Sequence, residues 1–258
     1  MSNINETNVV KKQYQNSKNL NMRISIHDKY STNKMGFGNW IFSNYDIQPG
    51  YRILELGCGT GSMWIGKNSI IEKSKLILSD FSSGMLETTK TNLSNYKNIE
   101  YQVIDIQDIP YPDKTFGIVI ANMMLYHVPN INKALEEVKR VLKDDGVFYC
   151  ATYGEHGIID YLSKLLFSCG IEDKTNKNFT LQNGKPLLEA YFNQVNRLNY
   201  EDSLAVTNVD DLIDYIYSLT SMTELSQLNK EKIKSILTNN MENGILNVPK
   251  EYGMFICK

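Results

Sequence analysis

An apolar run, residues 51–56, leads into three glycines at alternate positions in ELGCGTG. The run shows no alternation of polar and apolar residues, as expected of a strand buried on both faces of a parallel sheet. Gly57, Gly59 and Gly61 permit positive φ angles and place no Cβ between the backbone and a ligand. A helix that follows the glycine turn would point the free N–H groups of its first residues toward the same ligand. The sequence therefore predicts a ligand site where this strand ends.

A second predicted strand, residues 75–79, leads to Asp80 at its carboxyl end. In doubly wound sheets ligands lie at the carboxyl ends of the strands, and an acid there can accept both hydroxyls of a ribose. The dinucleotide fingerprint G-x-G-x-x-G does not fit, because these glycines are spaced G-x-G-x-G. Glu55, just before the turn, also suits a cationic ligand better than a diphosphate. A nucleoside cofactor other than a dinucleotide is therefore predicted.

The stretch ELGCGTG resembles motif I of the class I S-adenosylmethionine-dependent methyltransferases, and the similarity extends over about residues 20–153. In that family the glycine loop wraps the methionine part of the cofactor, and the acid after the second strand binds the ribose. Asp105 and Ile106 follow a third predicted strand, residues 99–104, where the family contacts adenine. Asn122 follows the fourth strand, beside the methyl-donor site. The cofactor-binding residues implied by the resemblance are Glu55, Gly57, Cys58, Gly59, Gly61, Asp80, Phe81, Met85, Asp105, Ile106 and Asn122.

Each of these features also has a purely structural explanation when it is taken alone. A tight turn can require Gly57 and Gly59 for backbone reasons, and Asp80 could cap the helix that follows it. The order of the motifs, each at the end of a predicted strand, favours the cofactor site. Cys58 is expected to contribute its backbone and not its thiol.

Strand and helix patterns alternate between residues 51 and 153, and residues 144–146 (Asp-Asp-Gly) predict a turn before a fifth strand, residues 147–152. We expect an α/β fold with a doubly wound, mostly parallel seven-stranded sheet of the Rossmann-like methyltransferase type. The resemblance adds an antiparallel hairpin at the end of the sheet, an N-terminal helical lid and an inserted cap. The expected segments are a lid over residues 1–45, an S-adenosylmethionine-binding core over 46–153, a cap over 154–193 and the completion of the sheet over 194–258.

Composition limits the expected partners and compartment. The chain of 258 residues has a formal net charge of −2, which lacks the basic character of nucleic-acid-binding proteins. Its four cysteines show no C-x-x-C pairing, so neither a disulfide framework nor a zinc site is expected. No apolar run reaches membrane-spanning length, and the N-terminus is too polar for a signal peptide. We expect a cytoplasmic protein with a small-molecule acceptor and no nucleic-acid or membrane partner.

The resemblance implies methyl transfer to an O, N or C atom of a small molecule, as in enzymes similar to those of ubiquinone and menaquinone biosynthesis. The cofactor carries the activated methyl group, so the protein mainly aligns the reactants. His127 is the candidate general base, because imidazole titrates near neutrality. No cluster of acids predicts a metal site. The candidate substrate residues are Tyr30, Tyr126, Tyr153 and His156, and His27 and Lys34 are further candidates in the lid.

Three other functions stay open at this point. An RNA or protein methyltransferase is disfavoured by the net charge, and ANMMLYHV after the fourth strand lacks the D/N-P-P-Y/F motif of amide and adenine N-methylases. A protein that binds S-adenosylmethionine without catalysis would keep the same motifs. A nicotinamide-dependent oxidoreductase uses a similar sheet, but the glycine spacing argues against it.

Overall fold

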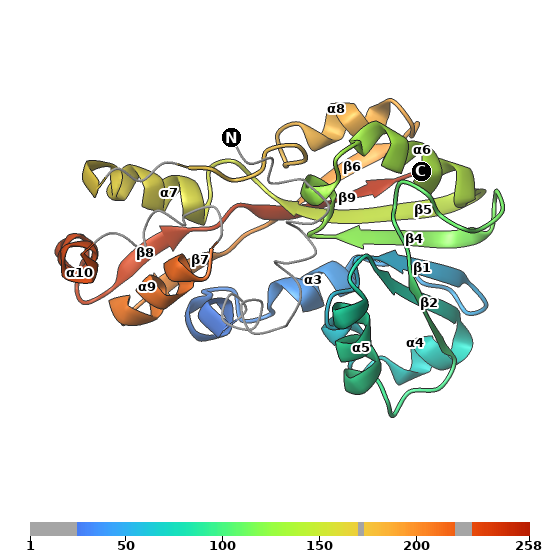
Figure 1. Ribbon diagram of the computed structural model, residues 1–258, viewed down its shortest axis with the longest axis horizontal. Coiled ribbons are helices and arrows are strands. Elements are labelled where there is room, and N and C mark those ends of the chain that lie inside the picture. The colour runs from blue at the N-terminus through green and yellow to red at the C-terminus, as the bar shows by residue number, and fades with distance from the viewer. Residues whose placement is uncertain (1–24, 170–172, 220–228) are drawn as a thin grey trace.

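A seven-stranded sheet forms the centre of the computed structural model, which describes residues 25–169, 173–219 and 229–258 (Figure 1). The strand order is β3-β2-β1-β4-β5-β9-β6. The strands β1 to β5 run parallel, and β9 is antiparallel to β5 and β6. The predicted sheet, seven-stranded and mostly parallel, is confirmed. Its strands are β1 (Arg52–Leu56), β2 (Lys75–Asp80), β3 (Ile99–Val103), β4 (Phe116–Asn122), β5 (Leu142–Tyr153), β6 (Val195–Tyr200) and β9 (Tyr252–Cys257).

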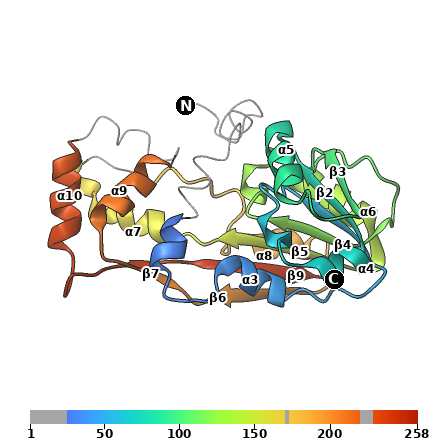
Figure 2. The same ribbon diagram turned by 90° about the horizontal axis from the view of Figure 1, so that it is seen from below.

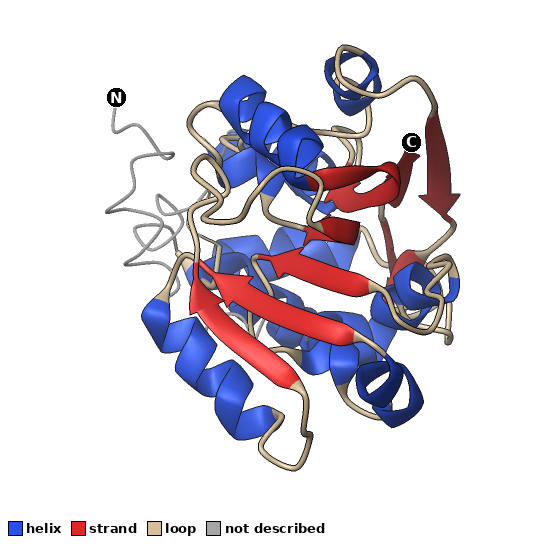
Figure 3. Ribbon diagram, turned by 90° about the vertical axis from the view of Figure 1, so that its right-hand side faces the viewer, coloured by secondary structure: helices blue, strands red, loops and turns tan. Residues whose placement is uncertain are grey.

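Helices cover both faces of this sheet (Figure 3). Residues from α6 and α8 pack in the hydrophobic cluster on one face, and residues from α3, α4 and α5 pack in the cluster on the other. The sheet is therefore doubly wound, as predicted. The helices that flank it are α3 (Phe37–Ser43), α4 (Asn68–Lys73), α5 (Ser83–Asn92), α6 (Ile131–Val141) and α8 (Gly184–Glu189), with short 3₁₀ turns η1 (Ser62–Trp64) and η2 (Leu125–His127).

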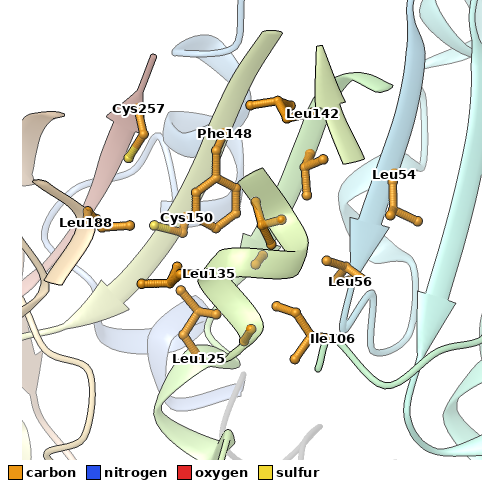
Figure 4. Packing of buried hydrophobic residues seen from close by; sticks show 14 of the residues in the cluster. Leu54, Leu56, Ile106, Leu125, Leu135, Leu142, Phe148, Cys150, Leu188 and Cys257 are labelled. Atoms are coloured by element: carbon orange, nitrogen blue, oxygen red, sulfur yellow. The ribbon is translucent and has the colours of Figure 1, made fainter. Parts of the chain in front are cut away.

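Burial on both faces explains why the central strands are apolar throughout. Successive side chains of a strand point to opposite faces, so Leu54 of β1 belongs to one cluster and Ile53 to the other. Figure 4 shows the first cluster, in which Leu135 of α6 lies near Phe148 and Cys150 of β5. Because no face of β1 meets water, no alternation of polar and apolar residues is needed.

The predicted turn at residues 144–146 lies within β5 and does not precede it. The pairing of β4 with β5 passes from Phe116–Leu142 directly to Ile118–Val147, so β5 carries additional residues at this point. A bulge of this kind keeps the strands paired on either side of it. The turn prediction was therefore wrong, because the residue types that favour a turn are equally suited to an exposed bulge.

A third hydrophobic cluster lies beside the sheet, among the elements on the left of Figure 1. We call the elements that build it the lateral lobe: α7 (Ile158–Leu165), β7 (Ser203–Val206), α9 (Val209–Tyr217), α10 (Lys230–Asn239) and β8 (Leu246–Pro249). The turn η3 (Phe167–Cys169) follows α7. Strands β7 and β8 form a separate two-stranded sheet, and the helical residues 25–30 add Ile26 to the cluster.

The lateral lobe changes how the sheet is completed. The resemblance to the methyltransferase family implies an antiparallel hairpin at the end of the sheet. Strands β6 and β9 do pair antiparallel, but β7, α9, α10 and β8 lie between them in the sequence. Figure 2 shows the ribbons of β6–β7 and β8–β9 continuing from the sheet into the lobe. These four elements of the lobe therefore replace the turn of the expected hairpin, whereas α7 precedes β6 in the sequence.

A buried ion pair joins the lobe to the N-terminal segment and the sheet. The side chains of Lys250 and Asp202, which form the pair, are 1% and 0% exposed. Lys250 Nζ also donates to Ser31 Oγ at 2.9 Å, and Asp202 Oδ1 accepts from the Asn33 backbone N–H at 2.9 Å. Because both charges are withdrawn from water, each depends on the other and on these hydrogen bonds.

We predict that Asp202→Asn lowers the free energy of unfolding by roughly 3–5 kcal/mol, because it leaves the buried Lys250 ammonium without an anionic partner. Chemical denaturation of the variant and the wild type measures this difference. The matched control is Asp144→Asn, which breaks the exposed pair with Lys114 and is expected to cost less than about 1 kcal/mol. Equal losses in the two variants contradict the structural role given to Asp202.

Candidate functional site

A cavity of about 790 Å³ opens at the carboxyl ends of β1, β2, β4 and β5. The last residues of these strands, Leu56, Asp80, Asn122 and Tyr153, all line it. Its size is that of a pocket for a cofactor or another small molecule. The predicted site residues that line it are Glu55, Gly57, Cys58, Gly59, Asp80, Phe81, Met85, Asp105, Ile106, Asn122, Tyr126, His127 and Tyr153, and His27 and Lys34 line it as well.

The glycine turn after β1 forms one wall of the cavity. Gly59 has φ 59°, and no atom lies within 4 Å of the position that a Cβ would occupy. Its exposed backbone can therefore meet a ligand closely. Gly61, with φ 70°, does not line the cavity, and a Cβ there would lie 2.6 Å from Thr89 Cγ2 on α5. The structure thus places Gly61 where the turn packs against α5.

Asp80 links this turn to the start of α5. Its Oδ2 accepts from the Gly59 N–H at 3.0 Å, and its Oδ1 accepts from the Ser82 N–H at 2.8 Å. Burial raises the pKa of Asp80 above its usual value, and the backbone hydrogen bonds act in the opposite direction. The cap of α5 is Ser82, whose Oγ accepts from the Met85 N–H at 3.3 Å. Asp80 is therefore not the side chain that caps α5.

Glu55 is a buried acid at the carboxyl end of β1. It is 3% exposed, and its Oε2 accepts a hydrogen bond from Trp64 Nε1 at 2.6 Å. Burial raises the pKa of Glu55 to about 7, although the hydrogen bond from Trp64 lowers it. The neighbouring Cys58 directs its sulfur to Thr89 Oγ1, 3.6 Å away in the core. The thiol of Cys58 thus packs against α5, as the sequence analysis expected of a residue that contributes its backbone.

The predicted adenine side is organised around Asp105. Its Oδ1 accepts from the backbone N–H of Gln107 at 2.9 Å and from Gln107 Nε2 at 3.1 Å. Gln107 Oε1 in turn accepts from the Asn130 backbone N–H at 3.1 Å, at the start of α6. Ile106, beside Asp105, is buried. These hydrogen bonds hold the Asp105 carboxylate at the edge of the cavity.

Tyr45 is a residue of this region that the sequence analysis missed. Its hydroxyl accepts from Asn122 Nδ2 at 2.6 Å, and Asn122 Oδ1 has no hydrogen-bond partner among the described residues. Burial, followed by the charge of Glu55, raises the pKa of Tyr45 well above its usual value. Met123, which follows Asn122, has φ 53°, a strained backbone for a residue other than glycine. No sequence signal connects Tyr45 with Asn122, because they meet only in the folded chain.

The predicted substrate residues divide into two groups. The rings of Tyr126 and Tyr153 lie 4.6 Å apart between centroids, and both residues line the cavity beside His127. Tyr30 and His156 do not line it. The hydroxyl of Tyr30 donates to Asp211 of α9, and His156 is exposed. Neither of these two residues is placed to meet a substrate inside the cavity.

The far end of the cavity is formed by residues that sequence analysis mostly missed. His27 lies there with Lys250, Tyr215 and Tyr252, and the last three come from or adjoin the lateral lobe. The rings of His27 and Tyr252 are 5.8 Å apart between centroids, and those of Phe37 and Tyr252 are 5.1 Å apart. No motif marks these residues, because their proximity depends on the path of the chain through the lobe.

Within residues 25–169, 173–219 and 229–258 there is neither a candidate membrane-spanning helix nor a candidate metal cluster. None of the helices in this part of the chain is both long and apolar enough to cross a membrane. No group of three or more His, Cys, Asp or Glu side chains there is arranged to hold a metal ion.

Comparison with known sequences gives the domain its family. The family described as a methyltransferase domain matches residues 54–150. The chain is 36% identical to a demethylmenaquinone methyltransferase of Symbiobacterium thermophilum over 108 residues, 40% of this chain and 43% of the relative. It is 34% identical to a ubiquinone/menaquinone biosynthesis C-methyltransferase UbiE of Hydrogenovibrio crunogenus over 104 residues, 39% of this chain and 41% of the relative. The matched segment is thus less than half of the length of either relative.

Solved structures share the fold at low sequence identity. A putative methyltransferase from an antibiotic biosynthesis pathway of Anabaena variabilis has a TM-score of 0.58 and 14% identity, covering 86% of this chain and 96% of that one. A putative methyltransferase of Bacillus halodurans has a TM-score of 0.57 and 16% identity, covering 85% and 96%. Residues 54–150 thus match a methyltransferase domain, and the sheet that carries them has the Rossmann-like fold of these solved methyltransferase structures.

Proposed function

We propose that the chain transfers a methyl group from S-adenosylmethionine to an oxygen, nitrogen or carbon atom of a small-molecule acceptor. The observation that carries this proposal is one cavity that extends from the glycine turn past the ends of β4 and β5 to the lateral lobe. It therefore has room for two molecules side by side. The net charge of −2 supports a small acceptor over a nucleic acid, and the four free thiols support a cytoplasmic location.

The cofactor half of the cavity is assigned to the turn and to three acids. We infer that Asp80 binds the ribose hydroxyls, since it lies at the carboxyl end of β2 and lines the cavity. Asp105 would accept from the adenine amino group, and the Ile106 N–H would donate to a ring nitrogen. Glu55 places a negative charge near the cationic part of the cofactor. S-adenosylmethionine supplies the activated methyl group.

Two walls of the acceptor half come from the predicted lid and cap. Residues of the segment 27–38 line the cavity, and so do residues 173–176. The second of these segments is held to the core, because Tyr153 Oη donates to the Asn176 carbonyl oxygen at 2.5 Å and Asn176 Nδ2 donates to the Tyr126 carbonyl oxygen. These contacts support the assignment of both segments to the substrate enclosure.

The acceptor is proposed to be flat and largely apolar. Two of the relatives are named for demethylmenaquinone methylation and for ubiquinone and menaquinone biosynthesis. The rings of Phe37, Tyr126, Tyr153, Tyr215 and Tyr252 line the cavity of this chain, and aromatic rings pack well on other planar ring systems. A quinol or another phenol is therefore the class of acceptor that fits best.

We predict that Asp80→Ala weakens binding of S-adenosylmethionine by about 1–3 kcal/mol, the range for hydrogen bonds to a charged group. Calorimetric titration of the variant and the wild type with S-adenosylmethionine, S-adenosylhomocysteine and NAD measures the change in affinity. The control is Asp145→Ala, which removes an exposed acid on β5 outside the cavity. Unchanged affinity in Asp80→Ala removes the ribose assignment, and binding of NAD in preference to S-adenosylmethionine overturns the proposed function.

We expect the affinity for S-adenosylmethionine to rise with pH up to about 7 and then to level off. The pKa of Glu55 is about 7 in the free protein. A cationic ligand favours the carboxylate and lowers this pKa, so binding below pH 7 requires the loss of a proton. Glu55→Gln keeps an acceptor for Trp64 Nε1 but cannot titrate, so its affinity should lack this rise. If the affinity of Glu55→Gln rises with pH in the same way as that of the wild type, Glu55 is not the group whose titration controls binding.

For His127, we predict that the Gln variant lowers kcat by roughly 10²-fold, the lower end of what a general base contributes. Binding of S-adenosylmethionine should be unchanged. Turnover is followed with labelled methyl donor and an acceptor found by screening phenols and quinols for methylated product. Full turnover of His127→Gln across the pH range shows that the imidazole is not the base.

A further inference from the structure

The strand order sets the spacing between Asn122 and Tyr252. Asn122 is the last residue of β4. Tyr252 is the first residue of β9 and pairs with Tyr153, the last residue of β5. Since β9 is two strands from β4, Tyr252 lies about 10 Å across the sheet from Asn122, at just under 5 Å per strand. It also lies two residues further toward the edge, because Asn122 is level with Ala151 and Met254. Both residues line the cavity, so a flat ring system can lie in the space between the donor site and Tyr252.

The imidazole of His27 lies next to Tyr252, and one of its two nitrogens has no hydrogen-bond partner among the described residues. His27 lines the cavity, and its Nδ1 is buried with no hydrogen-bond partner among the described residues. Its Nε2 lies 3.5 Å from the Tyr252 hydroxyl. A buried polar atom without a partner costs free energy. A ligand that completes the hydrogen bonding of His27 Nδ1 would remove that cost.

The buried groups around His27, at the end of the cavity next to the lateral lobe, carry no net charge. Burial and then the charge of Lys250 lower the pKa of His27 to about 3, and Asp202 acts weakly in the opposite direction. The imidazole is therefore uncharged near neutral pH, with one N–H donor and one acceptor nitrogen. Lys250 and Asp202 neutralise each other. Asp28 and Lys34 also line the cavity; Asp28 is exposed to water, and Lys34 Nζ donates to the Ser31 carbonyl oxygen at 2.7 Å.

Aromatic rings surround the imidazole. Tyr215 and Tyr252 meet His27 edge-on, with centroids 6.2 Å and 5.8 Å away, and Phe37 packs on Tyr252. A neutral hydrogen-bonding group inside an aromatic wall suits a hydroxyl or carbonyl carried by a planar ring. It suits an ammonium group poorly, because the carboxylate of Asp202 is already paired with Lys250.

We propose that His27 and Tyr252 anchor a hydroxyl or carbonyl oxygen of a flat, uncharged aromatic acceptor, with His27 Nδ1 as the hydrogen-bonding atom. This inference rests on the proposed function, since it needs the cofactor at the glycine turn. It assigns a binding role to His27, separate from the proton transfer proposed for His127. The anchor would present the far edge of the ring system to the methyl-donor site beside Asn122.

The test uses the full chain saturated with S-adenosylhomocysteine and two probes, 1-naphthol and naphthalene, followed by fluorescence titration. The wild type should bind 1-naphthol at least tenfold more tightly than naphthalene. His27→Leu should remove this preference and leave the affinity for naphthalene unchanged. His27→Asn, whose side-chain amide can reach the position of Nδ1, should restore part of the preference.

A second variant tests the anchor independently, in case His27→Leu does not fold. Tyr252→Phe removes one hydroxyl and keeps the ring, and it should reduce the preference for 1-naphthol severalfold. Equal affinities of the wild type for both probes, or a full preference retained in His27→Leu, overturn the anchor. If S-adenosylhomocysteine itself does not bind to the wild type, the proposed function fails; if it binds and the preference is absent, the anchor alone fails.

Discussion

The carboxylate of Asp80 holds together the part of the molecule on which the site depends. It accepts one backbone N–H from the glycine turn after β1 and another from the start of α5. This is possible because β1 and β2 run parallel with Leu56 opposite Ser79, so both strands end at the same edge. A charged acceptor makes such hydrogen bonds strong. The turn is therefore shaped before any ligand arrives.

The second determinant is the lateral lobe, which closes the cavity on the side away from β2. The lobe has a hydrophobic cluster of its own, and the buried pair of Lys250 and Asp202 connects it to the N-terminal segment. Removing two charges from water has a large cost that the pair alone offsets incompletely, so the added contacts of Ser31 and Asn33 matter. Three remote segments are thereby joined, and Ser31, Asn33 and Lys250 from two of them line the cavity.

Burial is the main cause of the electrostatic differences along the cavity. It raises the pKa of Glu55 to about 7 at one end and lowers that of His27 to about 3 at the other. In both cases desolvation penalises the charged form. A cationic ligand can restore the charge of Glu55 by lying beside it. His27 has Lys250 as its neighbour, so it stays neutral and can serve only as a hydrogen-bonding group.

The sequence by itself determined the sheet and the cofactor half of the cavity. The strands that end before Gly57–Gly61, at Asp80 and before Asp105 can be predicted because their patterns are local, and parallel strands bring their ends together whatever the rest of the chain does. Only the tertiary structure decided the acceptor half. Tyr215, Tyr252 and Lys250 have no local signature, and their places follow from packing between segments far apart in sequence. For the same reason the bulge in β5 could not be told from a turn, since the distinction lies in its pairing with β4.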